Sequence, residues 1–304
     1  MNALAVENVS KIYGNTKVLN RVTLTIEEGE FYAIMGPNGS GKTTLVSIIA
    51  SVCSPTEGKI KVYNSSNAKE LISYVPQENF SSPLLTGKEN LMYFAQLHGF
   101  RRREAAALAE SILDRISLSE VAEARVATYS GGMRKRLEVG TGLFPGTKII
   151  ILDEPTTGLD PGARREFLGL IKEMNEHGRT ILLITHIGED AELASRVGFI
   201  DEGVIVAEDT PEKLKKCSGL NNVLTIQTLI KTEKIYSTLK QFSDNERVLE
   251  TEEGYRIYCE NPEEVLPQVV RSLDRIGCTK TKIHVEAPSL EDVFFALTEK
   301  QVVP

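Results

Sequence analysis

A glycine-rich segment at residues 36–43 restricts this chain more than any other feature. It reads Gly-Pro-Asn-Gly-Ser-Gly-Lys-Thr and fits the pattern G-x-x-x-x-G-K-[ST]. It directly follows the apolar run 31–35 and opens a stretch of helical apolar spacing. In such a strand–loop–helix unit, glycines let successive backbone N–H groups face phosphate oxygens, and the helix N-terminus adds its positive end. A glycine-rich turn with a solvated lysine is the alternative. Because the context fits, the sequence predicts a nucleotide site.

Two positions in this loop and two in a later strand define the predicted chemistry. Lys42 can reach the β- and γ-phosphates, and the Thr43 hydroxyl can ligate Mg²⁺. Residues 149–154 read Ile-Ile-Ile-Leu-Asp-Glu, a buried strand that ends in two carboxylates at the sheet edge where ligands bind. There Asp153 can hold Mg²⁺, directly or through water, and Glu154 can polarise an attacking water. A strand followed by a helix-capping acid is the alternative for this pair alone. With the phosphate loop, nucleotide binding and hydrolysis are favoured.

The first 210 residues have the pattern of an α/β domain with an antiparallel start. Val22, Leu24 and Ile26 alternate with threonines, as in a half-buried strand. Nearly unbroken apolar runs at 31–35, 148–152 and 181–185 are typical of parallel strands that helices cover on both faces. We expect a helix carrying Leu45, Ile48, Ile49 and Val52 on one face, a helix over 161–177 closed by Gly178, and a hairpin over 198–207.

The pattern breaks around 210–220, and the rest of the chain has a different order. Strands are expected at 223–229, 247–251, 255–259 and 281–286, and helices at 232–242 and 262–276. This is the β-α-β-β-α-β order of a ferredoxin-like arrangement. A final amphipathic helix would carry Leu290, Val293, Phe294 and Leu297 on one stripe. We therefore predict an ATPase-type domain over 1–215 and an accessory or regulatory domain over 221–304.

Charge and composition exclude several classes of protein. Lys and Arg total 35 against 42 Asp and Glu, a net charge of −7, so no global field attracts nucleic acid. No apolar run approaches the roughly 20 residues that span a bilayer, and the N-terminus lacks a signal-peptide pattern. The four cysteines lie far apart, which is typical of thiols in a reducing compartment. We expect a soluble protein on the cytoplasmic side.

Residues 129–133 read Tyr-Ser-Gly-Gly-Met. With this motif added to the phosphate loop and the acid pair, the chain resembles the ATPase subunit of an ATP-binding cassette (ABC) transporter. The resemblance covers roughly residues 3–215. The commoner form of this signature begins with leucine and ends in glutamine, while the central Ser-Gly-Gly is intact here. Ser130 can cap the following helix, and Gly131 and Gly132 leave bare N–H groups for a phosphate. The resemblance implies that these residues contact ATP held by the phosphate loop of a second ATPase subunit.

Four further positions match the family pattern. The resemblance implies that Tyr13 stacks on adenine, and that Gln77 touches Mg²⁺ and the attacking water and couples the site to the membrane partner. It also implies that Asp160 lies in a loop crossing the dimer interface and that His186 contacts the γ-phosphate. Each has a structural alternative: a surface tyrosine, an isolated glutamine, the N-cap of the helix at 161 and a histidine at a strand end.

The resemblance assigns the catalytic roles to Glu154, His186 and Gln77, and the Mg²⁺ to Thr43, Gln77 and Asp153. It assigns the ATP contacts within this chain's own loop to Gly36, Pro37, Asn38, Gly39, Ser40, Gly41, Lys42, Thr43 and Thr44. One departure follows the signature, where Gly140, Thr141 and Gly142 replace an alanine-rich stretch with an arginine. Because glycine inside a helix costs about 1 kcal/mol against alanine, unusual packing or unusual flexibility of that helix is expected.

Residues 288–294, Pro-Ser-Leu-Glu-Asp-Val-Phe, resemble a C-terminal motif of the drug- and antibiotic-export branch, whose transmembrane domains are separate chains. A helix capped by Ser289 and Asp292 is the alternative, and both can hold. The resemblance implies a homodimer that sandwiches two ATP molecules, a transmembrane permease partner, no nucleic acid, and a place on the inner face of the membrane.

Two other classes compete with this hypothesis. A soluble ABC-type ATPase of DNA repair or of the ribosome would carry two cassettes, coiled coils or zinc modules, and this chain has one cassette and no cysteine cluster. The second competing class is a nucleotide-gated binding module, in which the C-terminal domain senses a small ligand and ATP hydrolysis is vestigial. The intact Asp153, Glu154 and His186 argue against a loss of hydrolysis.

Overall fold

The computed structural model of the chain describes residues 1–63, 65, 68–220, 222–251, 253–278 and 281–298. The chain divides into two compact units. The first holds Met1–His186 and Asp190–Glu208, and the second holds Ile187–Glu189 and the chain from Asp209 onward. The division into functional domains at 215 and 221 stays a prediction.

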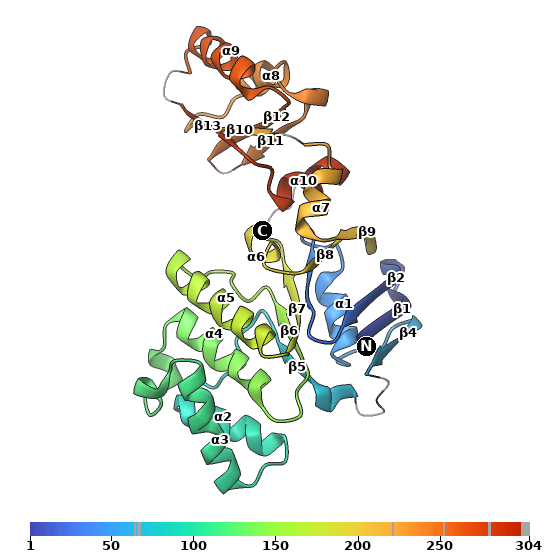
Figure 1. Cartoon of the computed structure of the whole chain (residues 1–304), viewed down its shortest axis with the longest axis vertical. Helices are drawn as coiled ribbons and strands as arrows, with labels where there is room; N and C mark the ends of the chain where they lie inside the picture. Colours follow the sequence, from blue (N-terminus) through green and yellow to red (C-terminus); the bar gives the residue numbers. More distant parts are fainter. Residues whose placement is uncertain (64, 66–67, 221, 252, 279–280, 299–304) are drawn as a thin grey trace. The chain divides into compact units, whose positions relative to one another are not determined.

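The first unit begins with an antiparallel sheet in the order β2-β1-β4 (Figure 1). Its strands are β1 (Asn2–Tyr13), β2 (Thr16–Glu27) and β4 (Glu57–Val62). In β2, Val22, Leu24 and Ile26 are buried while the two threonines between them are exposed. The predicted antiparallel start and its alternation are confirmed.

The central sheet of the first unit is mostly parallel, in the order β5-β6-β7-β3-β8-β9. Its strands are β3 (Phe31–Met35), β5 (Ile72–Val75), β6 (Ile149–Asp153), β7 (Thr180–Thr185), β8 (Arg196–Asp201) and β9 (Val204–Asp209). Strands β5, β6, β7, β3 and β8 run parallel, and every residue of β3, β6 and β7 is buried. The three apolar runs therefore form parallel strands, as predicted. Their carboxyl ends lie along one edge of the sheet.

The helices of the first unit flank this sheet and form a separate helical part around α2 and α3 (Figure 1). They are α1 (Lys42–Ile49), α2 (Gly87–Leu97), α3 (Arg102–Arg115), α4 (Gly131–Val139), α5 (Pro161–Glu176) and the short α6 (Gly188–Ala191), whose first two residues belong to the second unit. The described residues of this unit also include the 3-10 turns η1 (Ala68–Leu71), which precedes β5, and η2 (Ser119–Val121), η3 (Val126–Thr128) and η4 (Gly140–Leu143), which lie between α3 and β6.

One helix prediction needs correction. Val52 lies outside α1, which ends at Ile49, and its side chain is 69% exposed. The chain turns at Ser51, where φ is 58°, so the apolar spacing continued past the end of the helix. By contrast, α5 begins at Pro161 behind the Asp160 cap and ends before Gly178, as predicted.

The glycines after the signature allow close packing. The regular helix α4 stops at Val139, and the chain continues as η4. A Cβ atom on Gly142 would lie 2.7 Å from Ile150 Cδ1 of β6, and one on Gly140 would lie 3.0 Å from Ile112 Cγ2 of α3. The expected unusual packing is present, because η4 approaches its neighbours more closely than a side chain would permit.

The second unit contains the predicted ferredoxin-like order. After α7 (Pro211–Cys217) come β10 (Asn222–Gln227), α8 (Glu233–Lys240), η5 (Asp244–Glu246), β11 (Val248–Thr251), β12 (Gly254–Cys259), α9 (Pro262–Arg275), β13 (Lys282–Glu286) and α10 (Leu290–Thr298). The sheet order is β11-β12-β10-β13, and all pairs are antiparallel. Helices α8 and α9 pack on one face through a shared apolar core.

Helix α10 packs on the other side of this sheet. Its Phe295 ring stacks on Tyr258 of β12, with 6.2 Å between ring centroids. Leu290, Val293 and Phe294 are fully buried, but Leu297 is 49% exposed in the last turn of the helix. The predicted apolar stripe is therefore wrong at Leu297, where the helix leaves its side chain in solvent.

A buried carboxylate fixes the start of α10. Asp292 is 0% exposed, and its oxygens accept hydrogen bonds from the Ser289 N–H at 2.7 Å and the Tyr258 hydroxyl at 2.9 Å. The Ser289 hydroxyl accepts in turn from the Asp292 N–H at 3.3 Å, which is the predicted reciprocal cap. An Arg256 guanidinium nitrogen lies 3.0 Å from the same carboxylate.

We expect Asp292→Ala to destabilise the second unit by about 2–4 kcal/mol, because it leaves a buried guanidinium and a buried hydroxyl without their partner. Urea unfolding followed by tyrosine fluorescence measures the change. The control is Glu286→Ala, which removes an exposed carboxylate 3.3 Å from the same guanidinium and should cost less than about 1 kcal/mol. Equal midpoints for the two variants would contradict this assignment.

Candidate functional site

The loop over 36–41 joins β3 to α1 and has a conformation that depends on glycine. Gly41 has a φ of 102° and stands at the N-cap of α1, where it offers no side chain to the helix N–H groups. A Cβ on Gly36 would lie 2.1 Å from the carbonyl oxygen of Ile200. The loop therefore lies against β8 and presents bare backbone N–H groups at a helix N-terminus.

Lys42 is buried inside this loop. Its Nζ donates to the carbonyl oxygens of Gly36 at 2.8 Å and Pro37 at 3.0 Å, and it lies 3.7 Å from Glu154 Oε1. Burial lowers the pKa of Lys42, and the nearby Glu154 carboxylate acts in the opposite direction. The ammonium group is thus held inside the loop, where the carboxylates of Glu154 and Asp153 both oppose the effect of burial on its pKa.

The two acids at the end of β6 have different surroundings. Asp153 is 1% exposed and accepts a hydrogen bond from the Tyr74 hydroxyl at 3.2 Å through Oδ2. Its Oδ1 is buried, and within the described part of the chain no protein group donates to it. Burial raises the pKa of Asp153, while the hydrogen bond from Tyr74 lowers it.

The backbone leaves the extended conformation of β6 at Glu154. Its φ is 46°, an uncommon left-handed value for a residue with a side chain, while its N–H still donates to Ile184 O of β7 at 2.9 Å. Its Oε2 lies 3.3 Å from His186 Nδ1, and its Oε1 faces Lys42. The nearby His186 ring lowers the pKa of Glu154 below its ordinary value, against the effect of burial. The carboxylate is therefore ionised at neutral pH.

Lys42 and Glu154 line one pocket of about 190 Å³, whose lining does not include Asp153 or His186. The lining residues come from β2, from the phosphate-type loop and the start of α1, and from the chain after β5 and β6: Val18, Asn38, Gly39, Gly41, Lys42, Thr43, Thr44, Gln77 and Glu154. The sequence motifs predict neither Val18 as a residue of the pocket lining nor the hydrogen bond between Tyr74 and Asp153. The register of β5 on β6 pairs Tyr74 with Ile151, and only strand pairing could have revealed that contact.

Other predicted site residues lie elsewhere in the first unit. Ser130 and Asp160 cap α4 and α5: the Ser130 hydroxyl accepts from Met133 N–H, and Asp160 Oδ1 accepts from Gly162 and Ala163 N–H. Neither lines the pocket. Both are exposed, as is Gly131.

The two capped helices come together beside the signature. A Cβ on Gly132 would lie 2.7 Å from Ala163 Cβ, so the start of α4 lies against the start of α5.

Tyr13, the predicted adenine-stacking residue, does not line the pocket. Its side chain is 50% exposed, and Lys11 Nζ lies 4.9 Å from the centroid of its ring.

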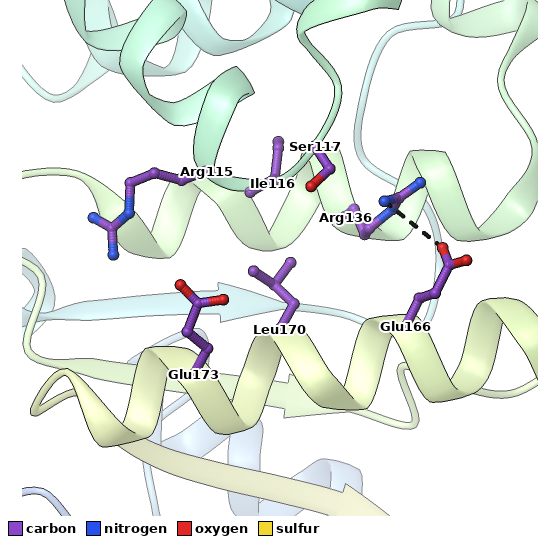
Figure 2. Close-up of a pocket in the computed structure, with 7 residues that line it drawn as sticks. All are labelled: Arg115, Ile116, Ser117, Arg136, Glu166, Leu170 and Glu173. Atoms are coloured by element: carbon purple, nitrogen blue, oxygen red, sulfur yellow. Dashed lines mark ion pairs between the residues drawn. The ribbon is translucent and has the colours of Figure 1, made fainter.

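A larger pocket of about 400 Å³ lies between α3, α4 and α5 and contains none of the predicted residues. Figure 2 shows its lining, with Arg136 of α4 facing Glu166 of α5 at 3.7 Å. Arg115 and Glu173 also line it, so charges of both signs face the space. This mixed lining gives no single charge for a ligand to match.

The fold is that of an ATP-binding cassette. The family model described as ABC transporter matches residues 19–157. The linearmycin resistance ATP-binding protein LnrL of Bacillus subtilis is 31% identical over 97% of this chain and 98% of its own length. The doxorubicin resistance ATP-binding protein DrrA of Mycobacterium tuberculosis is 32% identical over 97% and 93%, respectively. A Nod factor export ATP-binding protein of Rhizobium etli is 31% identical over 99% and 95%.

Solved structures agree over the cassette. A dimeric post-hydrolysis state of the ATP-binding cassette MJ0796, bound to ADP and Pi, is 29% identical with a TM-score of 0.62, covering 68% of this chain and 98% of that one. A subunit of an ABC transporter complex from Clostridium perfringens is 27% identical with a TM-score of 0.65, covering 70% and 90%. The resistance and export proteins, by contrast, match nearly the whole chain.

The chain therefore belongs to the ABC transporter family, as an ATP-binding subunit with ATPase activity, in the group of resistance and export proteins. Within the residues that the structure describes, no helix has the length and apolar character needed to cross a membrane.

The lowered pKa of Glu154 predicts a pH-dependent stability difference. Because the folded-state pKa lies below the unfolded value, ionised Glu154 stabilises the fold above about pH 4.3, and this contribution is lost as pH falls through the folded pKa. We expect the free energy of unfolding of the wild type, relative to Glu154→Gln, to decrease between pH 7 and pH 3 in urea titrations. A difference that stays constant or increases on acidification would contradict the pairing with His186.

Proposed function

We propose that the pocket around Lys42 and Glu154 is the ATP-hydrolysing site that drives an exporter whose membrane-spanning part is a separate permease. The observation that carries the proposal is the position of the Glu154 carboxylate, 3.7 Å from Lys42 Nζ and 3.3 Å from His186 Nδ1 at the mouth of a phosphate-type loop. A base, a cation and a polar group at one phosphate cradle are the components that phosphoryl transfer to water requires.

In this proposal the loop binds the phosphates of ATP. The backbone N–H groups of residues 38–44 face the phosphate oxygens, and Lys42 exchanges its bonds to two loop carbonyls for bonds to the β- and γ-phosphates. The Ser40 side chain supports this role, since its Oγ is buried in the loop and no described residue pairs with it.

The residues present fit a magnesium ion. The unpaired Oδ1 of Asp153 and the Thr43 hydroxyl are the hard oxygen donors that Mg²⁺ prefers, and the amide oxygen of Gln77, which lines the same pocket as Thr43, would be a third. Bound there, the ion would neutralise charge on the transferred phosphoryl group. Few protein ligands are expected, because Mg²⁺ in such sites is held largely by phosphate and water.

Glu154 acts as the general base toward the attacking water in this proposal, and His186 keeps one of its oxygens in place while contacting the γ-phosphate. Its lowered pKa keeps the carboxylate ionised at neutral pH, so that it can accept a proton. The left-handed backbone at Glu154 supports this role, since strained φ values cluster at active sites.

A head-to-tail pair of chains would complete each site. Ser130, Gly131 and Asp160 are exposed and do not line this chain's own pocket, so they are available to a nucleotide bound by a second copy. The α4 N-terminus provides N–H groups for that nucleotide. The dimeric cassette bound to ADP and Pi supports such a pair. Tyr13, with its exposed ring, would stack on the adenine.

The direction of transport and the location follow from the relatives. Proteins named for linearmycin resistance, doxorubicin resistance and Nod factor export match this chain over almost its full length. We therefore assign export, with a homodimer of this chain on the inner face of the membrane, bound to a transmembrane permease and not to nucleic acid.

Glu154→Gln should reduce steady-state ATPase activity about 10²- to 10⁴-fold, because the base is removed while the loop is unchanged. Binding of ATP, measured by equilibrium dialysis, should remain within a few-fold of the wild type. Glu166→Gln is the matched control, since this carboxylate is 66% exposed, pairs with Arg136 and does not line the pocket around Lys42 and Glu154. Normal turnover by Glu154→Gln would exclude Glu154 as the base.

Mixing two inactive variants tests the shared site. Lys42→Ala disables the loop, and Gly131→Asp places a carboxylate where the second chain's phosphate would lie. The new Cβ at 131 meets Leu159 at an ordinary 3.4 Å, so the variant should fold. Each variant alone should be inactive. An equal mixture should recover roughly a quarter of the wild-type rate, because half of the pairs are mixed and each has one intact site. No recovery in the mixture would contradict a site built from two chains.

A further inference from the structure

Helix α4 holds the segment 76–81 with buried charged side chains that the ATP site does not use. Glu138 is 1% exposed, and its Oε1 accepts three hydrogen bonds from this segment. The donors are the N–H groups of Phe80 and Ser81, both at 3.1 Å, and the Ser81 hydroxyl at 2.7 Å. One carboxylate oxygen on the helix thus fixes the second half of the segment.

Lys135, one turn earlier, fixes the first half. It is 6% exposed, and its Nζ donates to the carbonyl oxygens of Gln77 at 2.8 Å and Pro76 at 3.2 Å. The same nitrogen lies 3.5 Å from Glu138 Oε2. Burial lowers the pKa of Lys135, and Glu138 opposes that shift. The ammonium group therefore binds the backbone of the residue whose side chain lines the nucleotide pocket.

Arg134 adds a third attachment. Its Nε donates to the Ser81 hydroxyl at 2.9 Å, and its terminal nitrogen donates to the Ser81 carbonyl oxygen. We refer to Arg134, Lys135 and Glu138 as the α4 cluster. All three act on segment 76–81, and most of their bonds go to its main chain, so they fix the path of the backbone.

Burying the charged groups of the α4 cluster has a free-energy cost. Taking an ammonium group and a carboxylate out of water costs several kcal/mol each, and apolar side chains of similar volume are often no less stable. What the α4 cluster provides, and an apolar contact would not, is a directional attachment of both halves of a six-residue backbone segment to one helix. Gln77 itself remains exposed, with only its main chain held.

We propose that the α4 cluster is a positioning device that links the two nucleotide sites of the pair. Helix α4 begins at the signature residues that would touch the nucleotide on the second chain, and its cluster holds the segment carrying Gln77 at this chain's own pocket. Glu138 lies eight residues after Ser130, about 12 Å along one rigid helix. This inference rests on the proposed function, because it uses the roles assigned there to Gln77 and Ser130.

The consequence is that Gln77 moves with α4. When the N-terminus of α4 is drawn to the second chain's nucleotide, segment 76–81 moves as part of the same body and brings the Gln77 side chain to its own γ-phosphate. Hydrolysis then requires the closed pair. Without the cluster, the segment takes up other positions, and the loss falls on turnover more than on ATP binding.

The test is a double-mutant cycle in ATPase turnover. We expect Glu138→Ala to lower kcat about 10- to 100-fold, with the KM for ATP changed less than about 3-fold. Gln77→Ala should also lower kcat. If Glu138 acts through Gln77, the double variant should be no slower than the slower single variant, because the two losses are then one loss.

The control is Glu166→Ala, which removes the exposed ion pair to Arg136 of the same helix (Figure 2) and should leave kcat within about 2-fold. Glu138→Gln keeps the volume and one acceptor oxygen and is expected to recover part of the loss. If Glu138→Ala does not fold, the cycle of Glu138→Gln with Gln77→Ala carries the same test.

Multiplied losses in the double variant, or an unchanged kcat in Glu138→Ala, would overturn the linking role. A rise in KM at constant kcat would overturn it as well, since that pattern indicates weaker ATP binding. These results differ from a failure of the proposed function, in which the wild type hydrolyses no ATP or Glu154→Gln turns over normally.

Discussion

The site depends on placing a carboxylate, Glu154, in a nearly buried position between Lys42 and His186. A buried ion is tolerated only when charged or polar partners are within a few ångströms, so the three side chains must arrive together. They follow three different strands, since Glu154 and His186 come directly after β6 and β7, and Lys42 begins the helix that follows β3. Parallel pairing of β3 with β7 and of β7 with β6 brings those ends to one edge. The fully buried strands are therefore a condition for the chemistry, because any slip in their register would separate the groups.

The same demand for partners organises the rest of the first unit. The buried charges of α4 are satisfied by the backbone of segment 76–81, and the carboxylate of Asp190 lies 2.7 Å from an Arg164 nitrogen on α5. The first pairing joins a helix to a loop, and the second joins α5 to α6. In the second unit, the buried carboxylate of Asp292 joins the cap of α10 to Tyr258 and Arg256. Buried polar groups thus fix relative positions where apolar packing alone would allow sliding.

Local sequence signals predicted most elements because their physical causes are local. Pro161 and Gly178 bound a helix through fixed φ and left-handed φ, and the alternation in β2 reports one buried face. The two incorrect helix predictions concern residues at or beyond the C-terminal ends of helices. Val52 continued the apolar spacing after the helix had stopped, and Leu297 had the right spacing but no surface to cover it. Spacing states which residues share a face, but not whether a partner surface extends that far.

Short-range patterns in the chain are enough to predict the phosphate-type loop, the acid pair at the end of β6, the caps at Ser130, Asp160 and Ser289, and the ferredoxin-like order of the second unit. Each of these is encoded within a few neighbouring residues. Folding in three dimensions determines which side chains meet: the hydrogen bond from Tyr74 to Asp153, the position of Glu154 between Lys42 and His186, and the attachment of segment 76–81 to α4. Those contacts join residues up to 112 positions apart, the separation of Lys42 and Glu154. Strand order and helix packing create them, and no local pattern carries that information.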